Sequence, residues 1–86
     1  MNARFKFISD PSHGWLEVKL DDVQSVELSV EDFSTCSYRN GNVLYLEEDR
    51  DAPLFLMALK DLGVKPNIEG EFIERNCFVR KLKPIR

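Results

Sequence analysis

The dipeptide Asn40-Gly41 constrains the fold of this chain more than any other feature. An Asn-Gly pair favours the type I′ turn of a two-residue β-hairpin, because both central positions of that turn need a positive φ. Apolar and polar residues alternate on either side of the dipeptide, with Tyr38 before it and Val43 and Tyr45 after it. The segment 34–48 is therefore predicted to form an antiparallel hairpin.

A second hairpin is predicted over residues 3–20. Its first half alternates, with Phe5 and Phe7 on one side of a strand, and the stretch WLEVKL resumes the alternation with Trp15 or Leu16 pointing inward. The letters SDPSHG between the two halves supply turn chemistry. The Asp side chain can bond nearby backbone amides, the Pro fixes its own φ, and the Gly permits a positive φ.

The stretch DAPLFLMALKDLG predicts a helix over residues 52–62. Asp51 suits the N-cap position, Pro53 fits the first turn, and Gly63 closes the C-terminal end. We expect the inner stripe of this helix to consist of Phe55, Ala58, Leu59 and Leu62.

Residues 20–33 give a mixed pattern. A short helix over 20–27 is favoured, although an alternating apolar pattern that begins at Val26 leaves a strand as the alternative. A helical turn is expected over 29–33, started by Ser29 with Asp32 three residues later, as in a capping box.

The remaining C-terminal segment predicts a third hairpin, with strands over 65–73 and 76–83. The element order is then ββ-α-ββ-α-ββ. We therefore predict a single α+β domain over residues 1–86, with a mostly antiparallel sheet and two helices packed on one face.

The composition is that of an ordinary globular domain, with 86 residues, 43% of them hydrophobic and 31% charged. The longest apolar run, Leu54 to Leu59, is too short for a membrane span, and no secretory signal is visible, so we expect a cytoplasmic protein. In that compartment Cys36 and Cys77 are expected to be free, buried thiols.

The net charge of −3 is unevenly distributed along the chain. Residues 10–51 hold eleven acidic and three basic side chains, whereas residues 75–86 hold five basic ones and no acidic one. The chain lacks the overall basicity of a nucleic-acid-binding protein, so a nucleic-acid partner is not favoured. Weak phosphate contact through the C-terminus is kept as an alternative to a solvated strand edge, with the candidate residues Arg80, Lys81, Lys83 and Arg86.

The single histidine, His13, lies three residues after Asp10. A His-Asp pair can act as a general base, with the carboxylate fixing the imidazole tautomer. The alternative is a plain turn, in which Asp10 bonds backbone amides and His13 is partly exposed. We favour the turn and keep as a rival a small enzyme or ligand-binding protein that uses His13 and Asp10, with Tyr38 or Tyr45 lining a pocket.

Metal and cofactor sites find little support in the sequence. One His and two distant Cys do not make a zinc site, and no glycine-rich phosphate loop is present. The stretch EEDRD, Glu47 to Asp51, has four carboxylates that could attract a hard cation, but it lacks the alternating spacing and the Gly of a calcium loop and precedes a helix, where negative charge is favourable anyway. We expect no cofactor.

The helix over 52–62 carries more apolar residues than one buried face can use. If Phe55 and Leu59 face the sheet, Leu56 and Met57 are left toward solvent, unless the loop over 29–36 covers them. Exposed contiguous apolar surface often marks an interface. Leu56 and Met57 are therefore candidate contacts for a partner protein or for a homodimer.

Three stretches together resemble a set of small proteins of bacteriophages and other bacterial mobile elements: FISDPSHGWLEV at 7–18, SYRNGNVLYLEED at 37–49 and DAPLFLMALKDLG at 51–63. Members of that set pair an S-D-P-x-H-G-W-L-x-V turn with a Y-L-E-E-D segment before a helix. The resemblance implies a bacterial or phage origin. It transfers no activity and no site residue, because no activity is assigned to the set.

The sequence thus favours a non-enzymatic protein-binding module that blocks a host protein. We expect Leu56 and Met57 to make the hydrophobic contact and Glu47, Glu48 and Asp49 the electrostatic one. That a mobile-element protein of this kind acts by blocking a host protein is an expectation from analogy, not from the chemistry of these residues.

Overall fold

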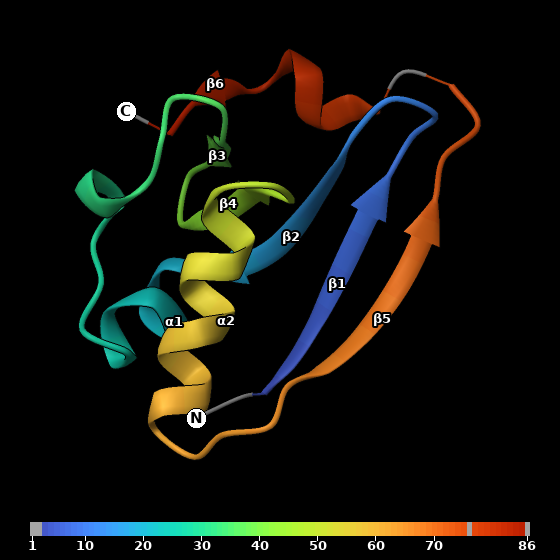
Figure 1. Ribbon diagram of the computed structural model, residues 1–86. Helices are drawn as coiled ribbons and strands as arrows, with labels where there is room; N and C mark the ends of the chain where they lie inside the picture. The colour runs from blue at the N-terminus through green and yellow to red at the C-terminus, as the bar shows by residue number, and fades with distance from the viewer. Residues whose placement is uncertain (1–2, 76, 86) are drawn as a thin grey trace.

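The computed structural model describes residues 3–75 and 77–85. It is an α+β structure, as predicted, in which two α-helices accompany a six-stranded sheet (Figure 1). In chain order the elements are β1 (Arg4–Ser9), β2 (Gly14–Lys19), α1 (Leu20–Ser25), the 3-10 turn η1 (Val30–Asp32), β3 (Tyr38–Asn40), β4 (Val43–Glu47), α2 (Asp51–Asp61), β5 (Asn67–Phe72), the 3-10 turn η2 (Phe78–Lys81) and β6 (Lys83–Pro84).

The sheet is mixed, with the strand order β5-β1-β2-β4-β3-β6. The two N-terminal hairpins form as predicted, and β2 of the first pairs antiparallel with β4 of the second. β5, in contrast, pairs parallel with β1, so that Phe5 lies beside Ile68 and Ser9 beside Phe72. The other pairs of described strands are antiparallel, as predicted, and the parallel pair of β1 with β5 is the departure from the predicted sheet of hairpins.

The predicted hairpin over 65–73 and 76–83 is wrong. Its first strand joins β1, and most of its second half folds as η2, leaving only β6 to pair with β3. The physical reason is that the face of the sheet opposite the helices needs a cover. Cys77 and Val79 supply it by packing against Trp15 on that face.

The main core lies between the sheet and both helices. Alternate residues of β2 and β4, such as Leu16, Leu44 and Leu46, point to this side and are fully buried. Phe55 of α2 packs edge-on against Phe5 of β1, with ring centroids 5.3 Å apart. Because the same alternation points Trp15 and Tyr45 to the other side, the central strands are buried on both faces.

The Asn-Gly hairpin forms, but its turn is one residue later than predicted. Asn40 pairs with Val43, so the central residues are Gly41 and Asn42. Gly41 has a φ of 61°, whereas Glu27 is the only non-glycine residue with a positive φ in the described chain. The turn therefore has a positive φ only at its first central residue, as in a type II′ turn, whereas a type I′ turn has a positive φ at both central residues.

The helical elements form close to the predicted ranges, but two details of α2 differ: Leu62, predicted on the inner stripe, is 58% exposed just after the helix ends, and the N-cap is not the predicted residue. α1 and the turn η1 form, and the backbone N–H of Ser29 donates to the carboxylate of Asp32, as expected for that part of a capping box. α2 ends before Gly63, also as predicted. Asp51 is not the N-cap, however: it is the first residue of α2, and its buried carboxylate serves another purpose, described below.

Candidate functional site

The turn between β1 and β2 is built around the buried carboxylate of Asp10. Its Oδ1 accepts hydrogen bonds from the backbone N–H groups of Ser12 and His13, each at 2.9 Å. The backbone N–H of Asp10 in turn donates to the carbonyl of His13 at 2.9 Å. The stretch SDPSHG is thus a turn that its own aspartate holds closed, as the sequence favours.

Gly14 ends this turn for a different reason from the one expected. It does not adopt a positive φ. A Cβ at this position would instead lie 2.5 Å from Cζ of Phe7, closer than real Cβ atoms approach another heavy atom. A larger residue at position 14 would therefore displace the Phe7 ring, so the close approach of that ring, and not backbone conformation, favours glycine here.

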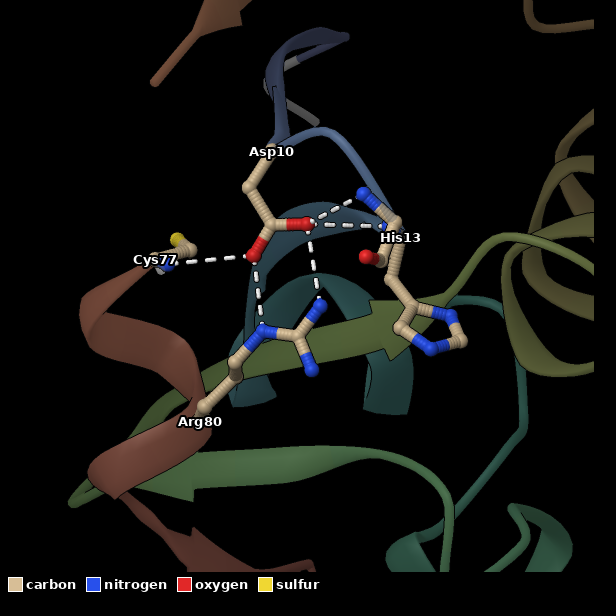
Figure 2. A network of polar contacts seen from close by, with 5 residues as sticks. Asp10, His13, Cys77 and Arg80 are labelled. Carbon is tan, nitrogen blue, oxygen red and sulfur yellow. Dashed lines mark hydrogen bonds and ion pairs between the residues drawn. The ribbon is translucent and has the colours of Figure 1, made fainter. Parts of the chain in front are cut away.

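The same carboxylate joins the N-terminal hairpin to the far end of the chain (Figure 2). Oδ2 of Asp10 accepts from the backbone N–H of Cys77 at 3.0 Å and from Nε of Arg80 at 2.7 Å, while Oδ1 accepts from Nη2 of Arg80 at 3.0 Å. The two-pronged bond to the Arg80 guanidinium, together with the three backbone N–H donors, holds the pKa of Asp10 far below its ordinary value. The Arg80 guanidinium has its own pKa raised by the same contact.

His13 is exposed, and its bond to Asp10 comes from the main chain. In Figure 2 the imidazole extends away from the Asp10 carboxylate. Both Asp10 oxygens are already occupied by other donors. The arrangement orients a turn and an arginine, and it does not orient the imidazole as a general base.

A hollow of about 420 Å³ opens beside this turn. It collects side chains from the turn, β2, the loop before β3, the start of β3, the end of β4 with the segment that leads to α2, and η2. Its lining consists of His13, Trp15, Thr35, Cys36, Tyr38, Glu47, Asp49, Arg50 and Arg80. Tyr38 lies in the hollow, as the ligand-binding rival requires, whereas Tyr45 packs against Phe78 instead.

Trp15 is the most deeply buried side chain of this hollow, at 2% exposure. Its ring stacks edge-on with Tyr38 at 6.3 Å and lies 5.5 Å below the Arg80 guanidinium carbon. Within the described residues its indole Nε1 is buried without a hydrogen-bond partner. An unmet donor of this kind is costly, so an acceptor placed at the nitrogen would be favourable.

A second buried aspartate fixes the wall of the hollow. Asp51, at the start of α2, accepts hydrogen bonds from the backbone N–H of Ser34 at 2.9 Å and from the hydroxyls of Ser34 and Ser37. The Ser37 hydroxyl also accepts from the backbone N–H of Glu47 at 2.9 Å. These bonds tie the loop before β3 to both β4 and α2, which explains why Asp51 is buried inside the structure rather than capping the helix.

The acidic residues Glu47, Glu48 and Asp49 lie together, with carboxylate oxygens within 4.8 Å of one another. Glu47 is buried and accepts from the backbone N–H groups of Asp49 and Arg50 at 2.9 and 3.0 Å. The other two are exposed. The group has the oxygen donors that a hard cation prefers, but Glu47 already serves as the cap of a turn.

The basic C-terminal residues that the structure describes differ in their surroundings. Arg80 turns inward to Asp10, while Lys81 and Lys83 are exposed. The remaining candidate, Arg86, lies outside the described residues. The guanidinium expected to contact phosphate is thus already paired with a carboxylate. The two cysteines also differ: both are free, but Cys77 is buried and Cys36 is exposed, so the expectation of a buried Cys36 is wrong.

The outer side of α2 carries exposed apolar side chains. Met57 is 60% exposed and Leu54 is 39% exposed, and the two are three residues apart, on one side of the helix. Leu56 is half-buried and packs against the main core, so Met57 is the more exposed of the two residues named from the sequence. Leu56 also lines an apolar hollow of about 460 Å³, together with Lys60, Gly63, Val64, Lys65 and Pro66.

Sequence reasoning missed several members of these sites. Thr35, Cys36 and Arg50 line the hollow beside Trp15, although no local pattern marks them. The partnership of Asp10 with Arg80 spans 70 residues of sequence, so no local pattern indicates it.

Comparisons with protein-family models, curated proteins and solved structures found no match to the chain. Within the described residues, no helix has the length and apolar character needed to cross a membrane.

Proposed function

We propose that this chain is a non-enzymatic protein-binding module and that the outer side of α2 is its contact surface. The observation that carries the proposal is the exposure of Met57 and Leu54 on that side of the helix, with Leu62 58% exposed at its end. Large apolar side chains gathered on one element favour burial against a partner. A bacterial or phage-infected cytoplasm is the proposed setting, and the blocking of a host protein the proposed role.

Charge at the two ends of α2 indicates the chemistry of the partner. Glu48 and Asp49 are exposed just before the helix begins, next to the single basic Arg50, whereas Lys60 and Lys65 lie at its C-terminal end, next to the single acidic Asp61, so the net charge is negative at one end and positive at the other. A helix of 11 residues separates these groups by roughly 16 Å. The complementary surface is an apolar patch with a basic rim at one end and an acidic rim at the other.

The test is a tagged pull-down from bacterial lysate, with and without nuclease, on the wild type and Met57→Glu. Gln24→Glu on α1 is the matched control, because it adds the same charge at another exposed helix position. We expect Met57→Glu to lower recovery of a stoichiometric partner by about tenfold or more, since a carboxylate would be buried in an apolar contact.

Retention of the partner by Met57→Glu would remove the α2 surface from the proposal. Loss of the partner on nuclease treatment would favour nucleic-acid contact instead. Self-association, measured by light scattering on the purified chain, would show that the contact is made with a second copy if Met57→Glu abolishes it.

A second candidate function is small-ligand binding in the hollow beside Trp15. It is favoured by the buried indole nitrogen of Trp15, which has no hydrogen-bond partner among the described residues, and by His13 and Tyr38, which line the same hollow. Trp15 is the only tryptophan, so its fluorescence reports on this hollow alone. A ligand screen read by that fluorescence tests the candidate: saturable changes that Tyr38→Ala removes would support it, and a flat response would end it.

A further inference from the structure

Strand β5 forms one edge of the sheet (Figure 1), and it is exposed along its whole length. All six of its residues are exposed, including two large apolar ones, Ile68 at 43% and Phe72 at 62%. Among the described strands only β1 pairs with it. β5 is thus held by backbone pairing on one side and presents its other side to solvent.

The backbone groups that face outward can be identified from the register. The N–H groups of Asn67 and Ile73 donate toward β1, to the carbonyls of Ala3 and Ser9, each at 2.7 Å. In a parallel pair, alternate residues direct both their N–H and C=O groups to the neighbouring strand. The residues between them, Ile68, Gly70 and Phe72, therefore direct theirs to the free edge, which is a template for another strand.

The side chains of β5 divide into an apolar and an acidic face. Ile68, Gly70 and Phe72 share the side of Phe5, whereas Glu69 and Glu71 lie on the opposite side. A Cβ added at Gly70 would meet no atom within 4 Å. The space between Ile68 and Phe72 can therefore receive a large side chain from a neighbouring strand.

A second copy of β5 is a poor occupant of this edge. Antiparallel self-pairing centred on Gly70 would match Ile68 with Phe72, but it would also set Glu69 opposite Glu71 twice. Like charges directly opposite each other in a sheet are destabilising. The same glutamates would be favourable opposite basic side chains.

We propose that the free edge of β5 docks an extended segment of a partner protein in which basic and apolar residues alternate. The basic side chains lie beside Glu69 and Glu71, and the apolar ones lie beside Ile68 and Phe72 and over Gly70. Main-chain hydrogen bonds supply the affinity, and the alternating side chains supply the selectivity. This edge is separate from the outer side of α2, so either surface can fail its test without affecting the other.

The two glutamates contribute unequally. Glu69 lies beside Lys6 in the register of β1, which already offsets part of its charge, whereas Glu71 lies beside the apolar Ile8. Reversal of charge at Glu71 is therefore expected to weaken docking more than the same change at Glu69.

The experiment uses the full chain, labelled with ¹⁵N, and three synthetic nine-residue peptides with blocked ends. The first alternates Lys and Val, the second has the same composition with its lysines grouped together, and the third alternates Glu and Val. We expect only the first to shift the amide signals of Ile68, Gly70 and Phe72 and to slow their hydrogen exchange. Glu71→Lys should weaken its binding by about tenfold or more. Glu31→Lys, an exposed charge reversal on η1, is the matched control.

Two results together would establish the docking edge. The wild type should select the alternating Lys-Val peptide, and the double variant Glu69→Lys, Glu71→Lys should instead prefer the alternating Glu-Val peptide. Equal binding of the two lysine peptides, or amide shifts confined to the region of Glu47 to Asp49, would overturn it by showing non-specific charge attraction. Concentration-dependent pairing of β5 with itself in the absence of peptide would also overturn it.

Discussion

Strands β4 and β5 belong to the same sheet but are stabilised in opposite ways. β4 lies between β2 and β3, and four of its five residues are buried, with Leu44 and Leu46 on one face and Tyr45 on the other. β5 is exposed at every position and pairs with one strand. Most of the apolar side chains of β4 are buried inside the molecule, whereas those of β5 are exposed on its surface.

The surroundings of Tyr45 show how completely β4 is enclosed. Burial, with the Glu17 carboxylate on the neighbouring strand, raises the pKa of Tyr45 to about 12. The segment that follows β5 provides the cover, since Phe78 packs edge-on against the Tyr45 ring at 5.6 Å. Central strands of this kind carry stability, and exposed edges are where strand-type recognition takes place.

The largest difference between the two strands should appear on truncation of one apolar side chain in each. Leu46→Ala removes a fully buried side chain from β4 and should lower the free energy of unfolding by ~2–5 kcal/mol. Ile68→Ala in β5 should cost less than about 1 kcal/mol, because Ile68 is 43% exposed. Urea denaturation of both variants checks the difference, and Leu46→Val provides a milder variant. Similar losses at the two positions would contradict the contrast between the strands.

The next largest effect on stability is expected at Asp10, whose carboxylate binds Cys77 and Arg80 and so holds η2 against the sheet. Asp10→Asn replaces one carboxylate oxygen with an amide donor that faces Arg80 or a backbone N–H, so the free energy of unfolding should fall. Because the folded pKa of Asp10 lies below its ordinary value of 3.8, the folded state binds fewer protons than the unfolded state at acidic pH. The charge-dependent stabilisation is therefore fully present above about pH 5 and declines as the pH falls below about 4.

Urea denaturation at pH 7, 5 and 3 measures this dependence, with Asp61→Asn as an exposed control on α2. The gap between wild type and Asp10→Asn should be wide at pH 7 and 5 and narrower at pH 3. A gap of constant width would mean that the shape of the aspartate matters and its charge does not.

β4 and β5 also differ in how far their pairing could be predicted from the sequence. Local patterns predicted the two N-terminal hairpins and α2, because turn residues and periodicity act over a few positions. The apolar pattern of Ile68 and Phe72 indicated a strand but not its partner. The parallel pairing with β1 joins residues more than 60 positions apart, which no local pattern encodes.

The candidate sites follow the same rule. The turn role of Asp10 was predicted, since its Ser12 and His13 partners are two and three residues away. Its bond to Arg80 was not, and neither was the bond from Ser34 to Asp51, 17 residues apart. Asp51 shows why: an aspartate before a helix satisfies the pattern of an N-cap equally well whether it caps the helix or bonds a distant loop.

The smallest expected effect is a gain of stability at the centre of β5. Gly70 does not have a positive φ, and a Cβ there would meet no atom within 4 Å, so a β-branched residue can be accommodated. Gly70→Val should raise the free energy of unfolding by about 0.5–1 kcal/mol, because glycine loses more conformational freedom on folding and valine favours extended backbone. Denaturant unfolding measures the gain, and Gly70→Ala should give a smaller one. A loss of stability would show that β5 depends on close packing at Gly70, in the same way that β4 depends on the close packing of its buried side chains. A gain would show that Gly70 weakens its own strand. The space above Gly70 would then be explained by the proposed docking, in which it receives a side chain from a partner strand.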